Sequence, residues 1–351
     1  MTSTEPANLL QSKANLPAGH PRVAFGRVGV LIVNLGSPPA TDTASVRRYL
    51  RQFLSDPRVI EIWRPLWLAI LNIAVLTTRP KRSAHAYSLI WDKASNESPL
   101  IVITRSQAGK LGPRLAGDGV TVDWAMRYGA PSIAEKITVL RELGAARILV
   151  VPLYPQYSAT TTASVEDAIK VALDALQWSP PLKTAAPFYA DPAYVDALAA
   201  VARDRIASLG WAPERVILSF HGLPERLVRA GDPYERQCVE TARLLRARLG
   251  WGAEYAPLAF QSRFGPEKWL GPAADQMIGR LAAEGVKRVA VMTPGFVADC
   301  LETLEEIAIA GRATFLAAGG ESFAAVPCLN DAPATTALLQ TIIARETAGW
   351  P

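Results

Sequence analysis

The sequence repeats one pattern along its length: a continuous apolar run of strand length, followed by a segment with helical periodicity. Strands are predicted at 29–35, 120–126, 148–153, 216–220 and 289–292, and helices at 43–54, 132–143, 164–176, 235–249 and 297–309. Near-continuous apolar strands that alternate with helices are typical of parallel sheets covered on both faces. The pattern therefore predicts an α/β protein with doubly wound, Rossmann-like parallel sheets.

The length of the chain predicts two such units. A chain of 351 residues, 50% of them hydrophobic, is longer than one ordinary core supports. Prolines at 180 and 181 end a helix, and the strand–helix pattern then starts again, so we expect a boundary there. The predicted parts are a flexible N-terminal tail (1–25), an N-terminal α/β lobe (26–178), a C-terminal α/β lobe (183–330) and a C-terminal helix (331–351).

Composition and charge narrow the class of protein. The net charge of +5 permits an anionic ligand or an anionic membrane surface as a partner. The basic residues are spread along the chain, and no helix-turn-helix, zinc-finger or RNP-like motif is present, so no nucleic-acid partner is expected. Three widely spaced cysteines and a polar N-terminus without a signal-peptide pattern indicate a reduced, cytoplasmic protein.

One segment, 60–76, departs from the strand–helix pattern. Its mainly apolar part, Leu66 to Leu76, is much shorter than the roughly 20 residues that a membrane-spanning helix needs. Tryptophans and a following basic cluster favour an amphiphilic lip that lies at a membrane surface, lines an apolar pocket, or does both. A buried core helix is the alternative interpretation.

A histidine and a set of acids are predicted to meet at the carboxyl edges of the sheets. His221 ends an apolar strand, where open α/β sheets bind their ligands. Asp299, Glu302 and Glu306 follow a later strand and would share one face of a helix. An imidazole opposite carboxylates accepts protons or holds an ion such as Fe²⁺ loosely. A hydrogen-bonded core histidine and acids that only suit the helix dipole are the alternatives.

A cation and a phenol follow another strand. Arg127 is suited to bind an anionic substituent in a bidentate manner, and Tyr128 is suited to pack on a flat ring. A surface arginine beside a tyrosine at the edge of the core is an equally good interpretation. The local motifs of dinucleotide-binding proteins, P-loop nucleotidases, zincins and serine hydrolases are all missing from the sequence.

Five ordered segments resemble motifs of the ferrochelatase family, whose members insert Fe²⁺ into protoporphyrin IX to make haem. These are LIVNLGSP at 31–38, PLYPQYS at 152–158, SFHGLP at 219–224, QSRFGP at 261–266 with Trp269-Leu270, and DCLETLEE at 299–306. The resemblance covers nearly the whole chain. It implies two doubly wound Rossmann-like lobes, as in chelatases and periplasmic binding proteins, and a mobile apolar lip at 60–76.

The resemblance also implies roles for individual residues. His221 would be the essential histidine and Glu302 the facing glutamate, which together handle iron and the pyrrole protons. Independently of the resemblance, we expect Glu302 with Glu306 to relay protons or guide the metal. The residues that align with porphyrin contacts of the family are Leu35, Arg79, Tyr87, Ser98, Arg127 and Tyr128.

The sequence departs from the family pattern in three places. Cys300 stands where many relatives have a histidine, and the acidic line ends at Glu306. The C-terminal cysteine extension of cluster-containing members is missing. We therefore expect Fe²⁺ as a substrate, no tightly bound cofactor and no [2Fe–2S] cluster.

The implied partners are protoporphyrin IX and Fe²⁺. The apolar lip also allows a peripheral contact with an inner membrane. Two alternatives remain at this stage. The first is a chelatase for another tetrapyrrole, such as coproporphyrin, or for another metal. The second is a non-catalytic tetrapyrrole carrier on the same bilobed fold. The sequence carries no signal for an oligomeric state.

Overall fold

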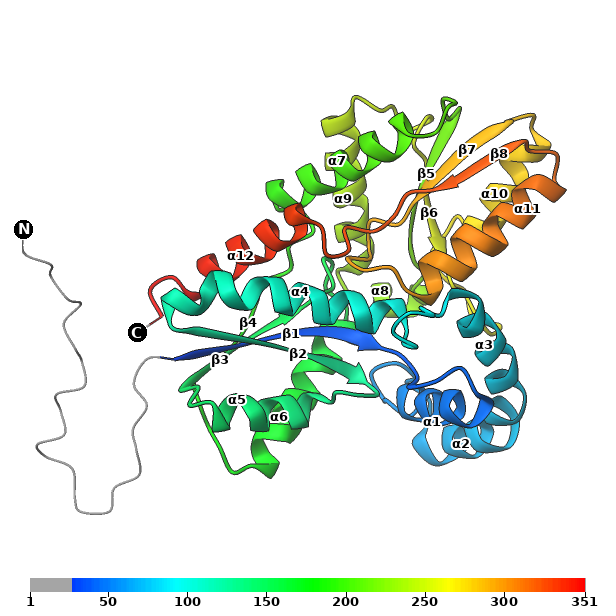
Figure 1. Ribbon diagram of the computed structural model, residues 1–351. Coiled ribbons are helices and arrows are strands. Elements are labelled where there is room, and N and C mark those ends of the chain that lie inside the picture. Colours follow the sequence, from blue (N-terminus) through cyan, green and yellow to red (C-terminus); the bar gives the residue numbers. More distant parts are fainter. Residues whose placement is uncertain (1–26, 351) are drawn as a thin grey trace, which may run out of the picture.

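The computed structural model describes residues 27–350, which form two lobes around two parallel sheets (Figure 1). The first sheet has the order β2-β1-β3-β4 and the second the order β6-β5-β7-β8, so the two lobes repeat one topology. The strands are β1 (Val28–Gly36), β2 (Val120–Tyr128), β3 (Arg147–Pro152), β4 (Leu182–Thr184), β5 (Arg215–His221), β6 (Leu258–Gln261), β7 (Arg288–Met292) and β8 (Ser322–Ala325). The predicted α/β class with parallel sheets is confirmed. The predicted tail, 1–25, lies outside the described residues.

Alternate residues of each strand pack into different cores. In β1, Leu31 and Val33 pack on one face under α5 (Ile133–Glu142) and α6 (Ser164–Ala175), whereas Val30 and Ile32 face the opposite way. In the second lobe, α10 (Ala274–Ala283) and α11 (Arg312–Ala317) cover the outer face. Because successive side chains in a strand point to opposite faces, each sheet is covered on both sides.

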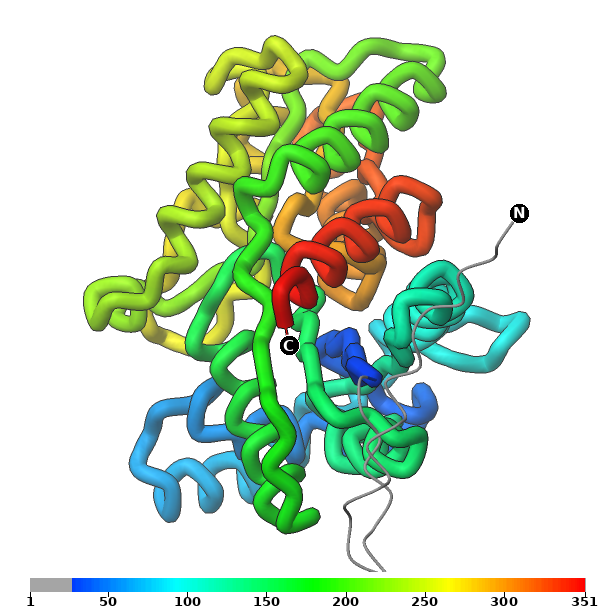
Figure 2. The backbone as a smooth tube through the Cα atoms, turned by 90° about the vertical axis from the view of Figure 1, so that its left-hand side faces the viewer, coloured from blue at the N-terminus to red at the C-terminus, as the bar shows by residue number. Residues whose placement is uncertain are grey.

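The inner faces of the two sheets share one continuous core. Helices from both halves of the chain fill it: α4 (Pro99–Leu115), α7 (Pro192–Ala207), α9 (Tyr234–Leu249) and α12 (Pro333–Thr347). The C-terminal helix α12 crosses between the lobes, packing on α4 and β3 of the first lobe and on α7 of the second (Figure 2). The sequence predicted this helix but not its position, which ties the two lobes together.

The boundary between the lobes lies later than predicted. Strand β4 pairs with β3, with Leu182 opposite Ile148, so the first sheet continues beyond the proposed end at residue 178. The strand is only three residues long and follows the two prolines, and a pattern of this length is too short to identify from sequence. The first lobe therefore includes Thr184, and the second begins in the connection to α7.

The lip lies on the surface of the first lobe. It comprises α2 (Arg64–Ile70), a π-helical turn η2 (Leu71–Val75) and the start of α3 (Leu76–Ile90), which pack against α1 (Thr43–Leu54). Leu71 and Leu76 are buried, whereas 73% of Trp63 and 76% of Ile73 is exposed. A segment with apolar residues on both its inner and outer faces does not match the buried core helix. No helix within residues 27–350 is long and apolar enough to cross a membrane.

Candidate active site

His221 is the last residue of β5, at the carboxyl edge of the second sheet. Its Nδ1 lies 2.6 Å from the Gly222 carbonyl oxygen, which can only accept, so Nδ1 carries a proton, and in the neutral imidazole the lone pair is on Nε2. Gly222 in turn donates its N–H to the Gln261 carbonyl at 2.7 Å, and a Cβ at Gly222 would lie 3.0 Å from the Trp269 ring. The strand end behind the imidazole is therefore closely packed.

The acidic helix begins later than predicted. Regular helix starts at Leu301 rather than 297, and the π-helix η5 (Glu302–Gly311) follows. Asp299 therefore precedes the helix and does not share its face with the two glutamates. Its carboxylate instead accepts hydrogen bonds from Thr303 Oγ1 at 2.9 Å and Asn330 Nδ2 at 2.7 Å, so it supports the loop. Glu302 and Glu306, four residues apart, remain on one face of the helix.

Glu306 is held by the residue that follows β6. Ser262 donates both its backbone N–H, at 2.7 Å, and its hydroxyl to the Glu306 carboxylate. Ser262 has φ of +64°, and this left-handed conformation directs both donors to the same side. Burial raises the pKa of Glu306, and the charge of Glu302 adds to the rise, whereas the Ser262 hydrogen bonds and the nearby imidazole of His221 oppose it. His221 and Glu302 thus both influence Glu306 electrostatically.

Gln261 connects the strand that carries His221 to the helix that carries Glu302 and Glu306. It lies opposite His221 in the parallel pairing of β5 with β6. Its Nε2 donates to the Glu302 carbonyl at 2.8 Å, and its Oε1 accepts from Ser219 Oγ at 2.7 Å. Gln261 and Ser262 belong to one of the family-like motifs, but the sequence did not indicate that they are site residues.

The first lobe faces Glu302 with two residues of α3, which packs against η5. Burial lowers the pKa of the Arg79 guanidinium, and the carboxylate of Glu302 opposes that effect. Burial also raises the pKa of Tyr87, and Glu302 raises it further. The Arg79 guanidinium lies over the ring of Phe264, 5.3 Å from its centre. The site therefore lies between the lip helix of one lobe and the π-helix of the other.

Most of the predicted porphyrin contacts lie around this junction. Leu35, Tyr87 and Tyr128 belong to one apolar cluster under the lip, which Leu301 joins from the second lobe. Ser98 is buried at the start of α4, where the next helical residues pack against the loop that carries Cys300. The structure thus brings these residues to the same side of the two sheets as His221.

Arg127 and Tyr128 both donate hydrogen bonds to a carboxylate that the sequence did not predict as their acceptor. Asp56 lies in the loop after α1, and one of its oxygens accepts from Arg127 Nη2 at 2.6 Å, Tyr128 OH at 2.7 Å and Ser164 Oγ at 2.6 Å. Only 1% of Tyr128 is exposed. No local motif marks this role of Asp56, because these three side-chain donors are at least 71 residues away in the sequence. The porphyrin roles of Arg127 and Tyr128 stay predictions.

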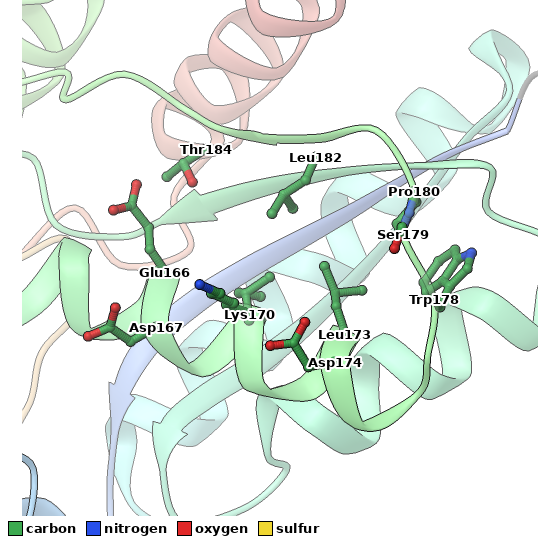
Figure 3. A pocket seen from close by; sticks show the side chains of 11 residues that line it. Glu166, Asp167, Lys170, Leu173, Asp174, Trp178, Ser179, Pro180, Leu182 and Thr184 are labelled. Carbon is green, nitrogen blue, oxygen red and sulfur yellow. The ribbon is translucent and has the colours of Figure 1, made fainter.

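Within residues 27–350, no three His, Cys, Asp or Glu side chains are grouped closely enough to hold a metal ion. Cys238, Cys300 and Cys328 are buried free thiols. A surface pocket of about 500 Å³ lies along α6 and β4, lined by residues that include Glu166, Lys170 and Trp178 (Figure 3). None of the predicted site residues lines this pocket.

The fold is that of the two-lobed chelatases. SirB from Bacillus subtilis with Fe³⁺ matches 92% of this chain and 96% of its own, with a TM-score of 0.56 at 14% identity. The sirohydrochlorin chelatase SirB from Bacillus subtilis subspecies spizizenii, in complex with cobalt, has a TM-score of 0.51 at 13% identity and covers 93% of this chain and 97% of its own. At these identities the similarity concerns the fold.

Sequence comparison places the chain more narrowly. The ferrochelatase family profile matches residues 27–347. The ferrochelatase of Rhizobium meliloti (strain 1021) is 54% identical over 94% of this chain and 98% of its own. That of Allorhizobium ampelinum is 52% identical over 96% and 98%, respectively. The chain belongs to the ferrochelatase family, and it is a metal-insertion lyase whose substrates are Fe²⁺ and protoporphyrin.

Proposed function

We propose that His221, Glu302 and Glu306 are the residues that carry out the insertion of Fe²⁺ into protoporphyrin IX. Insertion requires acceptors for two pyrrole protons and a site that holds the metal only until the macrocycle takes it. The lone pair on His221 Nε2 accepts a pyrrole proton. Glu306, whose pKa burial raises, takes up protons more readily than an exposed carboxylate, and Glu302 lies beside it to pass them on or to guide the metal.

A site with few ligands suits this reaction. Nitrogen and oxygen donors from His221 and Glu302 bind Fe²⁺ weakly compared with the four nitrogens of the porphyrin. A structural metal site, by contrast, surrounds its ion with four protein ligands. The ion can therefore leave the protein for the macrocycle.

The apolar cluster under the lip forms the binding surface for the ring in this proposal. Leu35, Tyr87 and Tyr128 would contact the macrocycle, with Ser98 at the rim. Arg79 and Arg127 would provide cations for its anionic substituents. Contacts remote from the reacting nitrogens supply binding free energy that offsets bending of the ring, and bending directs the nitrogen lone pairs toward the incoming ion.

The observation that carries this proposal is that Ser262 holds the Glu306 carboxylate next to Gln261, the cross-strand neighbour of His221, where both His221 and Glu302 influence its pKa. The test is anaerobic Fe²⁺ insertion into protoporphyrin IX, followed by the haem spectrum. His221→Ala should lower kcat by at least about 100-fold, because a positioned acid–base group contributes that much or more. His85→Ala is the matched control, since His85 is exposed on α3. Near-normal turnover by a folded His221→Ala protein would remove the imidazole from the mechanism.

We also infer that the protein works in the cytoplasm with its lip against the inner membrane. Trp63, Leu66 and Ile73 expose 73%, 50% and 76% of their surfaces on neighbouring turns of the lip. Exposed apolar residues at one site mark an interaction surface, and the substrate of this enzyme is itself poorly soluble in water.

Cosedimentation with anionic vesicles tests the membrane contact. Replacing Trp63 and Ile73 by serine should weaken vesicle binding several-fold. The control is Val171→Ser on α6, which removes an apolar residue that is 68% exposed elsewhere on the same lobe. Equal binding by the lip variant and the control would count against the membrane contact.

A further inference from the structure

One arginine bridges the two lobes at the start of the lip. Arg226 on α8 (Glu225–Arg229) donates from Nη1 to the carboxylate of Glu61, which precedes α2 in the first lobe. Its Nε lies 2.7 Å from Glu267 Oε1, in the loop 262–269 of the second lobe. The guanidinium thus joins a lip residue and a loop residue that are both acidic.

The loop 262–269 is also the loop that holds Glu306. It begins at Ser262, whose N–H and hydroxyl bind the Glu306 carboxylate. It ends against α8, where Glu225 N donates to the Lys268 carbonyl at 3.0 Å and Lys268 Nζ lies 2.9 Å from the Glu225 carboxylate. Helix α8 and the loop are therefore connected to each other at one end and to a reacting carboxylate at the other.

The lip contacts this loop at a second point. Arg79 of α3 lies over the ring of Phe264, which is the second residue after Ser262. Glu61 lies at the start of the lip (60–76), and Arg79 follows its end. Both ends of the lip are thus attached to the short segment that positions Glu306.

We propose that Arg226 is a positioning residue that couples closure of the lip to the placement of Glu306. This inference rests on the function proposed above. With the lip closed, one guanidinium pairs with Glu61 and Glu267 and holds the loop in the conformation in which Ser262 binds Glu306. A porphyrin that enters or leaves under the lip breaks the Glu61 contact, and the loop then loses one of its restraints.

The exposure of the contact suits repeated making and breaking. The side chains of Arg226, Glu61 and Glu267 are 41%, 45% and 41% exposed. Ion pairs in such surroundings contribute little and are weakened by salt, so they do not trap the lip. A planar guanidinium can serve two carboxylates at fixed angles, whereas an ammonium group is a single point charge.

Two measurements distinguish the contact of Arg226 with Glu61 from its contact with Glu267. The first is the rate at which protoporphyrin IX dissociates from the full-length protein without iron. The second is kcat for anaerobic Fe²⁺ insertion. Glu61→Gln should raise the dissociation rate about two- to fivefold, as expected for loss of an exposed ion pair, and should lower kcat slightly, because the loop loses one restraint. Glu267→Gln should mainly lower kcat, and Arg226→Gln should change both.

Two controls are available, a second arginine on α8 and a double variant. Arg229→Gln removes an arginine that is 70% exposed and pairs with Glu225 within α8, so neither rate should change. The double variant Glu61→Gln/Arg226→Gln should dissociate no faster than Arg226→Gln alone, because both changes remove one contact. High salt should speed dissociation from the wild type and not from Arg226→Gln.

The proposal fails if Arg226→Gln matches Arg229→Gln in both rates. It also fails if Arg226→Gln lowers the melting temperature while the dissociation rate and kcat stay at wild-type values, since its role is then structural only. A wild-type protein that releases porphyrin in the expected salt-dependent manner but inserts no Fe²⁺ would overturn the proposed function and leave the lip contact intact.

Discussion

The packing behind His221 allows a quantitative prediction for Gly222→Ala. The added Cβ would lie 2.7 Å from the Gln261 carbonyl oxygen and 3.0 Å from the Trp269 ring, whereas ordinary contact begins at 3.4 Å. The chain must therefore yield by about 0.7 Å at the carbonyl, and both obstacles are rigid. Overpacking of this kind costs about 1–3 kcal/mol of the free energy of unfolding. Because His221 is bonded to Gly222, the displacement moves the imidazole too.

Activity should suffer more than stability. A shift of nearly 1 Å in a catalytic group lowers turnover by roughly 10- to 100-fold. The assays are Fe²⁺ insertion and the midpoint of urea unfolding. Gly109→Ala in α4 is the control, because nothing lies within 4 Å of its added Cβ, and alanine stabilises a helix interior by about 0.5–1 kcal/mol. A Gly222→Ala protein with wild-type kcat and unchanged unfolding would refute the reasoning that this close packing positions the imidazole.

Three further predictions concern groups in and around the site. Tyr128→Phe leaves the buried carboxylate of Asp56 without one donor and should cost about 1.5–3 kcal/mol in urea unfolding; a loss below 0.5 kcal/mol would show that the hydroxyl is not needed there. The raised pKa of Glu306 means that the folded protein keeps this proton longer than the unfolded chain, so its stability contribution is lost as pH rises from the ordinary value of 4.5 through the raised one. Glu306→Gln should thus gain melting temperature over wild type at pH 8 compared with pH 5, and a difference independent of pH would contradict this. Purified protein should show no iron–sulfur absorption and no stoichiometric sulfide, because Cys238, Cys300 and Cys328 are fewer than the ligands that such a cluster uses.

The main strands and several helices could be predicted because their signals are local. The helix predicted at 43–54 has those bounds, and the strand predicted at 216–220 is β5, one residue longer at each end. Strands β4, β6 and β8 were missed because they have only three or four residues. Helices α3 and α4 were missed because each contains an internal proline, which counts as a helix breaker in a sequence.

In the candidate site, too, the features with local signals could be predicted and the others could not. That His221 stands at the end of a buried strand, and that Glu302 and Glu306 share a helical face, follows from neighbours within a few residues. Helix onset at Leu301 rather than 297 does not, because Asp299 is bound by Asn330, 31 residues further on.

The sequence alone therefore determined the two-lobed α/β class, the candidate side chains for the reaction and the apolar character of the lip, since burial and turn residues act over short stretches of chain. Only the tertiary structure decided which groups support them. Ser262 and Glu306 are 44 residues apart, and Glu61 and Arg226 are 165 apart. The first pair forms only when the second lobe folds and the second only when the lobes close on each other, so their geometry depends on the packing of the core rather than on any local pattern.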